Sequence, residues 1–373
     1  MQTNIRINKT VVKLDDDNPD KLLSYQNVLQ LTNKNKRALL LGNGFSMAYN
    51  KDRFSFTSLL KSALEKRIIT PDGPIHRAFK IFETSDFESI IRALEETNKV
   101  LSAYNYKKVP QFNEDAKRLQ QHLIKVITNN HPEKSTDIKP SEYASCMEFI
   151  RQYNKIYTLN YDILLYWVIM KLKEEGKPED KELISDGFRD ADGKEDYVVF
   201  KNTGDNSFGI HHLHGGLHLF NRGADVAKLT FSKTSIPLTE QITQHMNNNE
   251  YPVFISEGTS SAKEKKITHN PYLNHCYKSL AKLSRDLVIF GTGLKKNDEH
   301  IKKAIIESQC VNVYIGVANQ DKKSEWAAFE HDFKSKKVFV GQGKGKKKIG
   351  QERNVYYYDY HTVDIWGHND STK

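Results

Sequence analysis

The sequence predicts an α/β fold with a Rossmann-like parallel sheet, and three observations lead to this prediction. Short apolar runs rich in β-branched residues recur along the 373-residue chain, and each ends in glycine or in a polar step. A helix-like stretch follows each run, so strands and helices alternate. Two runs, at 286–290 and 311–317, flank one helical segment and form a βαβ unit, which requires parallel strands. Ligands of such sheets bind where strand ends and helix N-termini meet.

The first predicted strand, 37–42, runs into a glycine turn with the sequence Gly42-Asn43-Gly44-Phe45-Ser46. Glycines allow backbone to approach a pyrophosphate closely, and the N-terminus of the following helix offers unpaired N–H donors. Met47 stands where a third glycine would be expected. No acidic residue ends a second strand about twenty residues later, as a dehydrogenase-type site would require. An ordinary strand-to-helix turn explains the pattern equally well.

A long helical region follows, from about residue 50 to 150. Helical periodicity is clear at 87–94 and 119–127. We interpret the region as a helical insertion that covers the nucleotide cleft. Asp86 and Glu88, at the start of one helix, are expected to be surface or cap residues. Residues 1–36 predict a polar, partly helical arm ahead of a domain that spans residues 37–373.

Residues 155–166, with the sequence K-I-Y-T-L-N-Y-D-I-L-L-Y, form the most informative segment. A β-rich run ends in the polar step Asn160-Tyr161-Asp162, and an apolar helix begins near Ile163. This step places an amide and a carboxylate at the ligand-binding edge of the sheet, so Asn160 and Asp162 are candidate site residues. As the alternative, both residues simply cap the helix, a role that Asn and Asp often fill.

Four histidines lie within residues 211–218. Gly215 and Gly216 interrupt this run and predict a turn directly after His214, at the end of a strand. Imidazole titrates near neutral pH, so His214 is the candidate general base. The others are expected to be core residues with hydrogen-bonded rings: His211, His212 and His218.

The strand at 286–290 ends in a second glycine turn, Gly291-Thr292-Gly293-Leu294. The helix after it is expected to be capped at Asn297 or Asp298. An aromatic-rich last strand, 355–360, is expected to pack against the sheet.

Three further segments connect these elements. Two polar stretches, 171–207 and 221–250, are expected to be surface excursions, the second one mobile or partner-binding. The short run 253–255 leads to Ser256-Glu257-Gly258, another turn expected near the site.

Composition limits the classes of partner. The chain carries a net charge of +9, and its lysine-rich loop 341–348 lacks interleaved aromatic residues and any helix-turn-helix or zinc-finger pattern. We therefore expect a solvated loop or a contact with an acidic partner rather than nucleic acid, and the charge also suits an anionic dinucleotide. No run approaches the ~18 apolar residues of a membrane span, and no signal-peptide core is present. Three scattered cysteines fit a reducing cytoplasm: Cys146, Cys276 and Cys310.

Taken in order, the motifs resemble the signature blocks of sirtuins, which are a Gly-Ala-Gly-x-Ser loop, a Thr-Gln-Asn-x-Asp step, a His-Gly pair and a Gly-Thr-Ser-Leu loop. Their counterparts are residues 42–46, 158–162, 214–215 and 291–294. More closely, the chain is similar to SIR2-like proteins of bacterial anti-phage defence, in particular the DUF4917 group. Segments at 86–88, 161–167, 254–258 and 270–273 add to this resemblance, which spans about residues 37–320.

The resemblance implies a sirtuin-type fold and an NAD⁺ glycohydrolase that depletes NAD on infection. It implies that Asp162 fixes the carboxamide, that Asn160 orients water or ribose hydroxyls, and that His214 is the base. The glycine loops would hold the pyrophosphate and the adenosine ribose through Gly42, Asn43, Gly44, Phe45, Ser46, Gly291, Thr292 and Leu294. An enzyme that destroys a central cofactor must be held inactive. We therefore expect a separately encoded sensor protein in a hetero-oligomer, or a homo-oligomeric switch, in the bacterial cytoplasm.

Departures from the sirtuin pattern matter as much. Sirtuin deacetylases carry a four-cysteine zinc module, whereas this chain has three cysteines, so we expect no zinc and no other metal. Leu159 replaces the Gln and Gly293 replaces the Ser of the sirtuin blocks, which disfavours deacetylation but not NAD binding. An ADP-ribosyltransferase, a non-catalytic NAD- or ADP-ribose-binding subunit and a nucleic-acid-binding protein remain the alternatives.

Overall fold

A six-stranded parallel sheet forms the centre of the structure, a computed structural model that describes residues 4–7, 10–13, 22–106, 110–190, 193, 195–201, 208–256, 259–340 and 349–368. Its strands in spatial order are β14 (Asn354–Asp359), β11 (Asn312–Val317), β10 (Asp286–Phe290), β3 (Arg37–Leu41), β4 (Lys155–Thr158) and β7 (Ile210–His212). All neighbouring pairs are parallel, which confirms the predicted α/β class. Glu257, Gly258 and the lysine-rich loop 341–348 lie outside the described residues.

The strand order is that of Rossmann folds. Numbered along the chain, the six strands read 6-5-4-1-2-3 across the sheet, which is the order 3-2-1-4-5-6 seen from the other edge. The order reverses between β3 and β10, and ligands of such sheets bind in the crevice beyond the strand ends at this point.

Helices cover both faces of the sheet, as parallel strands require. Strand β3 is buried throughout, and its side chains alternate between two cores. Leu39 and Leu41 pack on the face covered by α1 (Tyr25–Leu31), α8 (Pro140–Ile150) and α9 (Leu164–Glu175). Ala38 and Leu40 pack on the opposite face, which is covered by α13 (Pro271–Ala281), α14 (Glu299–Glu307) and α15 (Ala327–Ser335).

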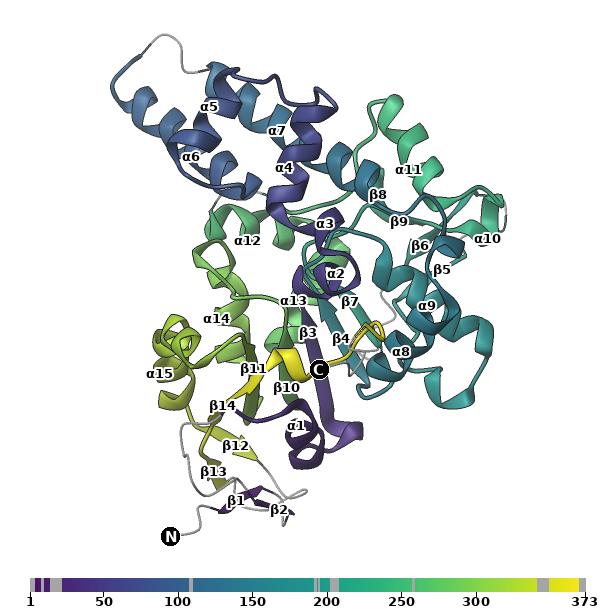
Figure 1. The fold of residues 1–373 in the computed structure, drawn as a ribbon, viewed down its shortest axis with the longest axis vertical. Coiled ribbons are helices and arrows are strands. Elements are labelled where there is room, and N and C mark those ends of the chain that lie inside the picture. The colour runs from purple at the N-terminus through teal and green to yellow at the C-terminus, as the bar shows by residue number, and fades with distance from the viewer. Residues whose placement is uncertain are drawn as a thin grey trace.

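The chain between β3 and β4 is helical, as predicted. It contains α2 (Gly44–Tyr49), α3 (Lys51–Phe54), α4 (Phe56–Glu65), α5 (Pro74–Ile81), α6 (Phe87–Ala103), α7 (Pro110–Asn130) and α8. Helices α4 to α7 form a lobe beyond the carboxyl ends of β3 and β4, and α12 (Ser260–His269) lies beneath this lobe (Figure 1).

The two polar segments predicted as surface excursions contain regular structure that was not expected. They contribute an antiparallel sheet made of β5 (Phe188–Arg189), β6 (Tyr197–Phe200), β9 (Asp225–Leu229) and β8 (Leu219–Arg222). Helices α10 (Phe231–Thr234) and α11 (Leu238–Asn247) follow, and α11 buries Leu238 and Ile242. Strands such as β8 (LFNR) and β9 (DVAKL) were missed because they are short and mix apolar and polar residues without regular alternation.

The segment 22–36, predicted as part of a separate arm, belongs to the α/β domain. Leu23 exchanges backbone hydrogen bonds with β14, and Tyr25 and Val28 of α1 are buried in the core. Two small hairpins pair β1 (Asn4–Ile7) with β2 (Thr10–Lys13) and β12 (Val338–Val340) with β13 (Ile349–Gln351). Short 3-10 helices occur at Lys34–Lys36, Ser135–Asp137, Pro178–Asp180, Lys296–Asp298, Gln320–Trp326 and Tyr360–Thr362.

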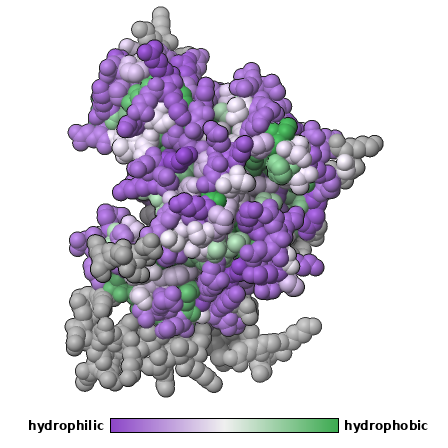
Figure 2. Space-filling model, turned by 45° about the vertical axis from the view of Figure 1, so that its right-hand side comes forward, coloured by the Kyte–Doolittle hydropathy of each residue, from purple (hydrophilic) through white to green (hydrophobic). Residues whose placement is uncertain are grey.

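The visible surface is mostly hydrophilic, and apolar residues form only small, separate patches on it (Figure 2). Among the residues that the structure describes, no helix has the length and apolar content needed to span a bilayer.

Candidate functional site

The loops that follow β3 and β10 pack directly on each other at the point where the strand order reverses. A side chain at Gly42 would place its Cβ 2.4 Å from the Cβ of Thr292, and one at Gly44 would lie 2.4 Å from the Cα of Gly291. Gly291 has φ +73°, which favours glycine. The N–H of Gly44 donates to the carbonyl of Gly291 at 2.8 Å, and the N–H of Gly42 donates to that of Phe290 at 2.9 Å. Loop packing therefore requires these glycines, and their role in binding pyrophosphate stays a prediction.

Three predicted site residues from two distant segments meet in one buried network. The hydroxyl of Ser46 donates to Oδ2 of Asp162 at 2.5 Å and accepts from the Nδ2 amide of Asn160 at 2.9 Å. Ser46 is fully buried, while Asn160 and Asp162 line a cavity. Oδ1 of Asp162 also accepts from the N–H of Leu164 at the start of α9, so this carboxylate does cap the helix, whereas Asn160 does not. Burial raises the pKa of Asp162 above its ordinary value.

His214 lies in the turn after β7, and the loop after it is held by close backbone contacts. Gly215 has φ +83°, and a Cβ there would lie 2.0 Å from the carbonyl oxygen of Val253. The N–H of Ile255 donates to the carbonyl of His214 at 2.9 Å. A turn is present, but it begins two residues earlier than predicted, because β7 ends at His212 and His214 lies within the turn. The imidazole of His214 lines the same cavity as Asn160.

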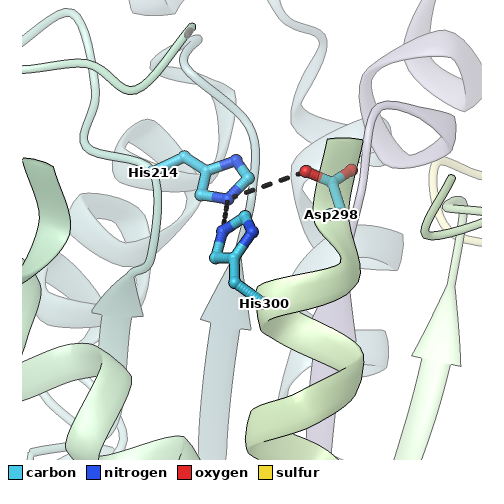
Figure 3. Close-up of side chains that lie close together, drawn as sticks. All are labelled: His214, Asp298 and His300. Atoms are coloured by element: carbon cyan, nitrogen blue, oxygen red, sulfur yellow. Dashed lines mark hydrogen bonds and ion pairs between the residues drawn. The ribbon is translucent and has the colours of Figure 1, made fainter. Parts of the chain in front are cut away.

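The ring of His214 is buried and paired with a second histidine. Nε2 of His214 lies 3.0 Å from Nε2 of His300 and 3.9 Å from Oδ1 of Asp298, and Figure 3 shows the three side chains directed toward one another. Burial, and secondarily the charge of Lys263, lowers the pKa of His214 well below its ordinary value. The ring is thus neutral at pH 7, which differs from the expected titration near neutrality but leaves it able to accept a proton.

The other three histidines of this segment lie in the core, as expected. The ring of His211 packs against that of Tyr157 in a tilted arrangement at 4.8 Å between ring centres, and His212 meets His218 edge to face at 4.9 Å. The expected hydrogen bonds are not found, because the ring nitrogens of His211 and His218 have no partner among the described residues. Aromatic packing is what holds these rings.

A buried charge network closes the far side of the cavity. The ammonium of Lys263, on α12, is fully buried and lies 2.6 Å from Oε2 of Glu88 and 3.0 Å from Oδ1 of Asp298. Burial alone would lower the pKa of Lys263, but these two carboxylates raise it above its ordinary value, so the ammonium stays charged. Burial raises the pKa of Glu88, an effect that Lys263 opposes and Asp298 adds to. The hydroxyl of Tyr161 lies 2.7 Å from Oε1 of Glu88.

The charge network also determines whether His214, Asp298 and His300 could together hold a metal ion. Nε2 of His214, Nε2 of His300 and Oδ1 of Asp298 lie within 4.8 Å of one another, and two histidines with a carboxylate are typical ligands of transition metals. However, the same Asp298 oxygen accepts from the ammonium of Lys263, which already supplies the positive charge. We therefore interpret the cluster as a hydrogen-bonded network. The predicted absence of metal stays a prediction.

Two adjoining cavities lie above the glycine loops. The inner one, with a volume of about 200 Å³, is lined by Asn160, Asp162, His214, Leu294, the glycine loops and apolar residues of α4 and α7. The outer one, about 610 Å³, extends over β11 and β14 and is lined by Lys51, Lys322, Trp326 and Tyr360 among others. Both cavities share Asn43, Phe56, Gly291, Thr292 and Gly293. One extended ligand can therefore lie across the switch point.

Two of the predicted cofactor-binding residues lie away from both cavities. Phe45 is buried and packs on Trp366 at 5.3 Å between ring centres, and its carbonyl accepts from the indole N–H at 3.1 Å. Ser46 lies below the cavity floor and contacts it only through Asn160 and Asp162. The side chain of Phe45 therefore points into the core, and a role of this residue in cofactor binding stays a prediction for its backbone alone.

Four residues of this site were not predicted as site residues: Glu88, Lys263, Asp298 and His300. Glu88 and Asp298 were assigned to helix ends, and Asp298 does occupy the N-cap of α14, but its side chain makes no cap bond there. The only sequence signal was Asp298-Glu299-His300 close behind the glycine turn. Lys263 gave none, since it stands in a lysine-rich helix that resembles a solvated surface.

Comparison with known proteins gives one finding about relationship. A family model described as a domain of unknown function, DUF4917, matches residues 39–366. A search of curated proteins finds no match.

Proposed function

We propose that this chain, which belongs to the DUF4917 family, is an NAD⁺ glycohydrolase. One observation carries the proposal: Asn160, Asp162 and His214, which follow two adjacent parallel strands, line a single cavity at the switch point of the sheet. An amide, a carboxylate and a neutral imidazole in one enclosed pocket suit the attack of water on the C1′ carbon of a ribose that carries a positively charged leaving group.

The reaction divides among these side chains as follows. The C1′–N1 bond breaks, neutral nicotinamide leaves with the electron pair, and water adds to the oxocarbenium-like ribose. His214 accepts the proton that the water loses, a role typically worth about 10²–10⁴ in rate. The amide of Asn160, fixed by Ser46, orients the water or a ribose hydroxyl. Asp162 accepts from the nicotinamide carboxamide on the cavity floor. ADP-ribose and a proton are the other products.

The cavities fit the two halves of a dinucleotide. The inner cavity is enclosed by Phe54, Leu59 and Leu123, and it suits the flat nicotinamide ring. The outer one offers Lys51, whose charge complements a pyrophosphate, and Lys322, which is paired with Glu325 of the same cavity. Volumes of about 300–1,000 Å³ are usual for ligand sites, and the outer cavity lies in this range. Gly293 has open space where a Cβ would be, so its exchange for the serine of sirtuins leaves the loop geometry intact.

We further propose that the fold is of the sirtuin type without a zinc module and that the enzyme acts in bacterial antiviral defence. The ordered motifs of the sequence support the first point. The second follows from the resemblance to SIR2-like defence proteins. Because unregulated loss of NAD would kill the cell, we expect a separately encoded partner or an oligomeric switch to control activity.

The test follows NAD⁺, nicotinamide and ADP-ribose in cells that express the chain with its genomic neighbours, before and after infection. We expect NAD⁺ loss that Asn160→Ala and His214→Ala abolish. His331→Ala is the matched control, because its side chain is 83% exposed and lines neither cavity. Full NAD⁺ loss in both cavity variants would refute the site assignment. Labelling of a macromolecule by ADP-ribose would instead identify a transferase, and intact bound NAD⁺ a regulatory subunit.

A further inference from the structure

The contact between His214 and His300 constrains the protonation of both rings. Their Nε2 atoms lie 3.0 Å apart, a hydrogen-bond distance. A neutral imidazole carries one N–H and one lone pair. Burial lowers the pKa of His300 to about 2, so this ring is neutral as well. One proton therefore lies between the two Nε2 atoms. The ring that holds this proton has an unprotonated Nδ1, and the other ring carries its proton on Nδ1.

Ser260 fixes the far side of His300. Its hydroxyl oxygen accepts from the backbone N–H of His300 at 2.7 Å and lies 3.1 Å from Nδ1 of the ring. A hydroxyl has two lone pairs, so it can also accept a ring N–H. If Nδ1 of His300 donates to Ser260, Nε2 of His300 is unprotonated and accepts from Nε2–H of His214. In the opposite case, Ser260 donates to Nδ1 and His300 donates to His214.

The carboxylate of Asp298 selects between these two arrangements. Its Oδ1 lies 3.9 Å from Nε2 of His214. An N–H at that position is attracted by the carboxylate, whereas a lone pair would be repelled. The first arrangement is therefore favoured, and it leaves Nδ1 of His214 as the basic nitrogen. Among the residues that the structure describes, Nδ1 has no hydrogen-bond partner, and the imidazole lines the inner cavity.

We propose that His300 is a positioning residue that holds His214 in the Nε2–H tautomer, so that Nδ1 faces the reacting water. This inference rests on the proposed glycohydrolase activity. When water bonds to C1′ and the C1′–N1 bond breaks, the proton of the water passes to Nδ1 of His214. The imidazolium keeps its Nε2–H bond to His300. His300 thus takes the part that a carboxylate plays behind the histidine of a Ser-His-Asp triad.

Two variants of His300 separate positioning from folding. Leucine removes the acceptor, so we expect His300→Leu to lower kcat by about 10²-fold or more, as loss of the correct tautomer does in the triad enzymes, with little change in KM. Glutamine offers a carbonyl oxygen that accepts from Nε2–H, and His300→Gln should regain much of the loss. His331→Gln is the surface control. Unchanged kcat in His300→Leu, or no recovery with glutamine, would overturn the proposal.

Nitrogen-15 NMR of histidine-labelled protein tests the tautomer without any turnover. Ring nitrogens with and without a proton differ strongly in chemical shift, and the spectrum of His214→Ala identifies the signals of His214. We expect protonated Nε2 and unprotonated Nδ1 in the intact chain. A proton on Nδ1 would overturn the inference. Absence of NAD⁺ cleavage by the intact, activated protein would refute the glycohydrolase proposal alone, because the spectrum still decides the tautomer.

Discussion

The buried ammonium of Lys263 offers the sharpest test of the site's electrostatics. It joins three elements that are distant in sequence, namely α6 through Glu88, α12 itself and the turn before α14 through Asp298. Replacing Lys263 with methionine keeps most of the apolar stem and removes only the charge. Two carboxylates then remain in a largely dry site, with side-chain exposures of 18% and 19% and no cation between them.

The expected loss follows from the two distances. At an effective dielectric constant of about 20, attraction across 2.6 and 3.0 Å is on the order of 6 kcal/mol for each pair. Most of this offsets the desolvation of the three groups, which costs several kcal/mol per ion. Removing one partner of a buried pair typically costs about 3–5 kcal/mol. We expect Lys263→Met to lower the free energy of unfolding by this amount near pH 8.

The loss should also depend on pH. Burial already raises the pKa of Glu88, and loss of Lys263 raises it further. A carboxyl group whose pKa is higher in the folded than in the unfolded state lowers the stability of the fold as the pH rises above the pKa of the unfolded state. The penalty of Lys263→Met should therefore be smaller near pH 5, where Glu88 can take up a proton, than near pH 8.

Urea unfolding followed by tryptophan fluorescence measures both effects. The matched control is Lys303→Met, which breaks a 3.2 Å ion pair with Glu264 whose lysine side chain is 55% exposed. Exposed pairs of this kind contribute less than ~1 kcal/mol. If Lys263→Met proved as stable as Lys303→Met at pH 8, the ammonium would not be the charged, dry centre that these distances describe.

Three further predictions concern the same region. Acid should destabilise the fold from about pH 6.5 downward, by about 1.4 kcal/mol per pH unit for each buried histidine, because only the unfolded chain takes up protons there. Urea midpoints at pH 7.5 and 5.5 would reveal this, and equal midpoints would contradict it. The histidines whose pKa is lowered in this way are His131, His211, His212, His214, His218 and His300. Gly215→Ala should destabilise the protein far more than Gly223→Ala. Both glycines have a positive φ, which costs alanine about 1–2 kcal/mol, but only at Gly215 would the new Cβ also clash with backbone. Similar melting points of the two variants would refute this reason. Ser46→Ala should cost about 1–3 kcal/mol by leaving buried polar partners unpaired and should abolish NAD⁺ cleavage, whereas full cleavage would separate Ser46 from the site.

The strands of the parallel sheet could be predicted because each is a local pattern. Runs such as Ala38–Leu41 and Leu287–Phe290 are apolar throughout and end in glycine, and a strand buried on both faces needs no more information than that. The antiparallel sheet was missed for the opposite reason. Strand β9, with the sequence DVAKL, buries four of its five residues, but Asp225 and Lys228 interrupt its apolar residues without regular alternation. Such a short pattern is not distinct from a polar loop.

The candidate site, too, could be predicted from the sequence only in part. The sequence predicted that Asn160, Asp162 and His214 stand at strand ends, and in a parallel sheet this alone directs them to one edge. It did not predict that Phe45 points away from that edge, because the rotation of α2 is set by its packing on Trp366.

The sequence by itself determined the alternation of strands and helices, the glycine turns and the edge at which polar residues gather, since each depends on neighbours within a few positions. Only the tertiary structure decided which charges and rings meet. Glu88 and Lys263 are 175 residues apart, and His214 and His300 are 86 apart. Electrostatic and hydrogen-bond energies depend on distance in space and on burial, and no local pattern records either.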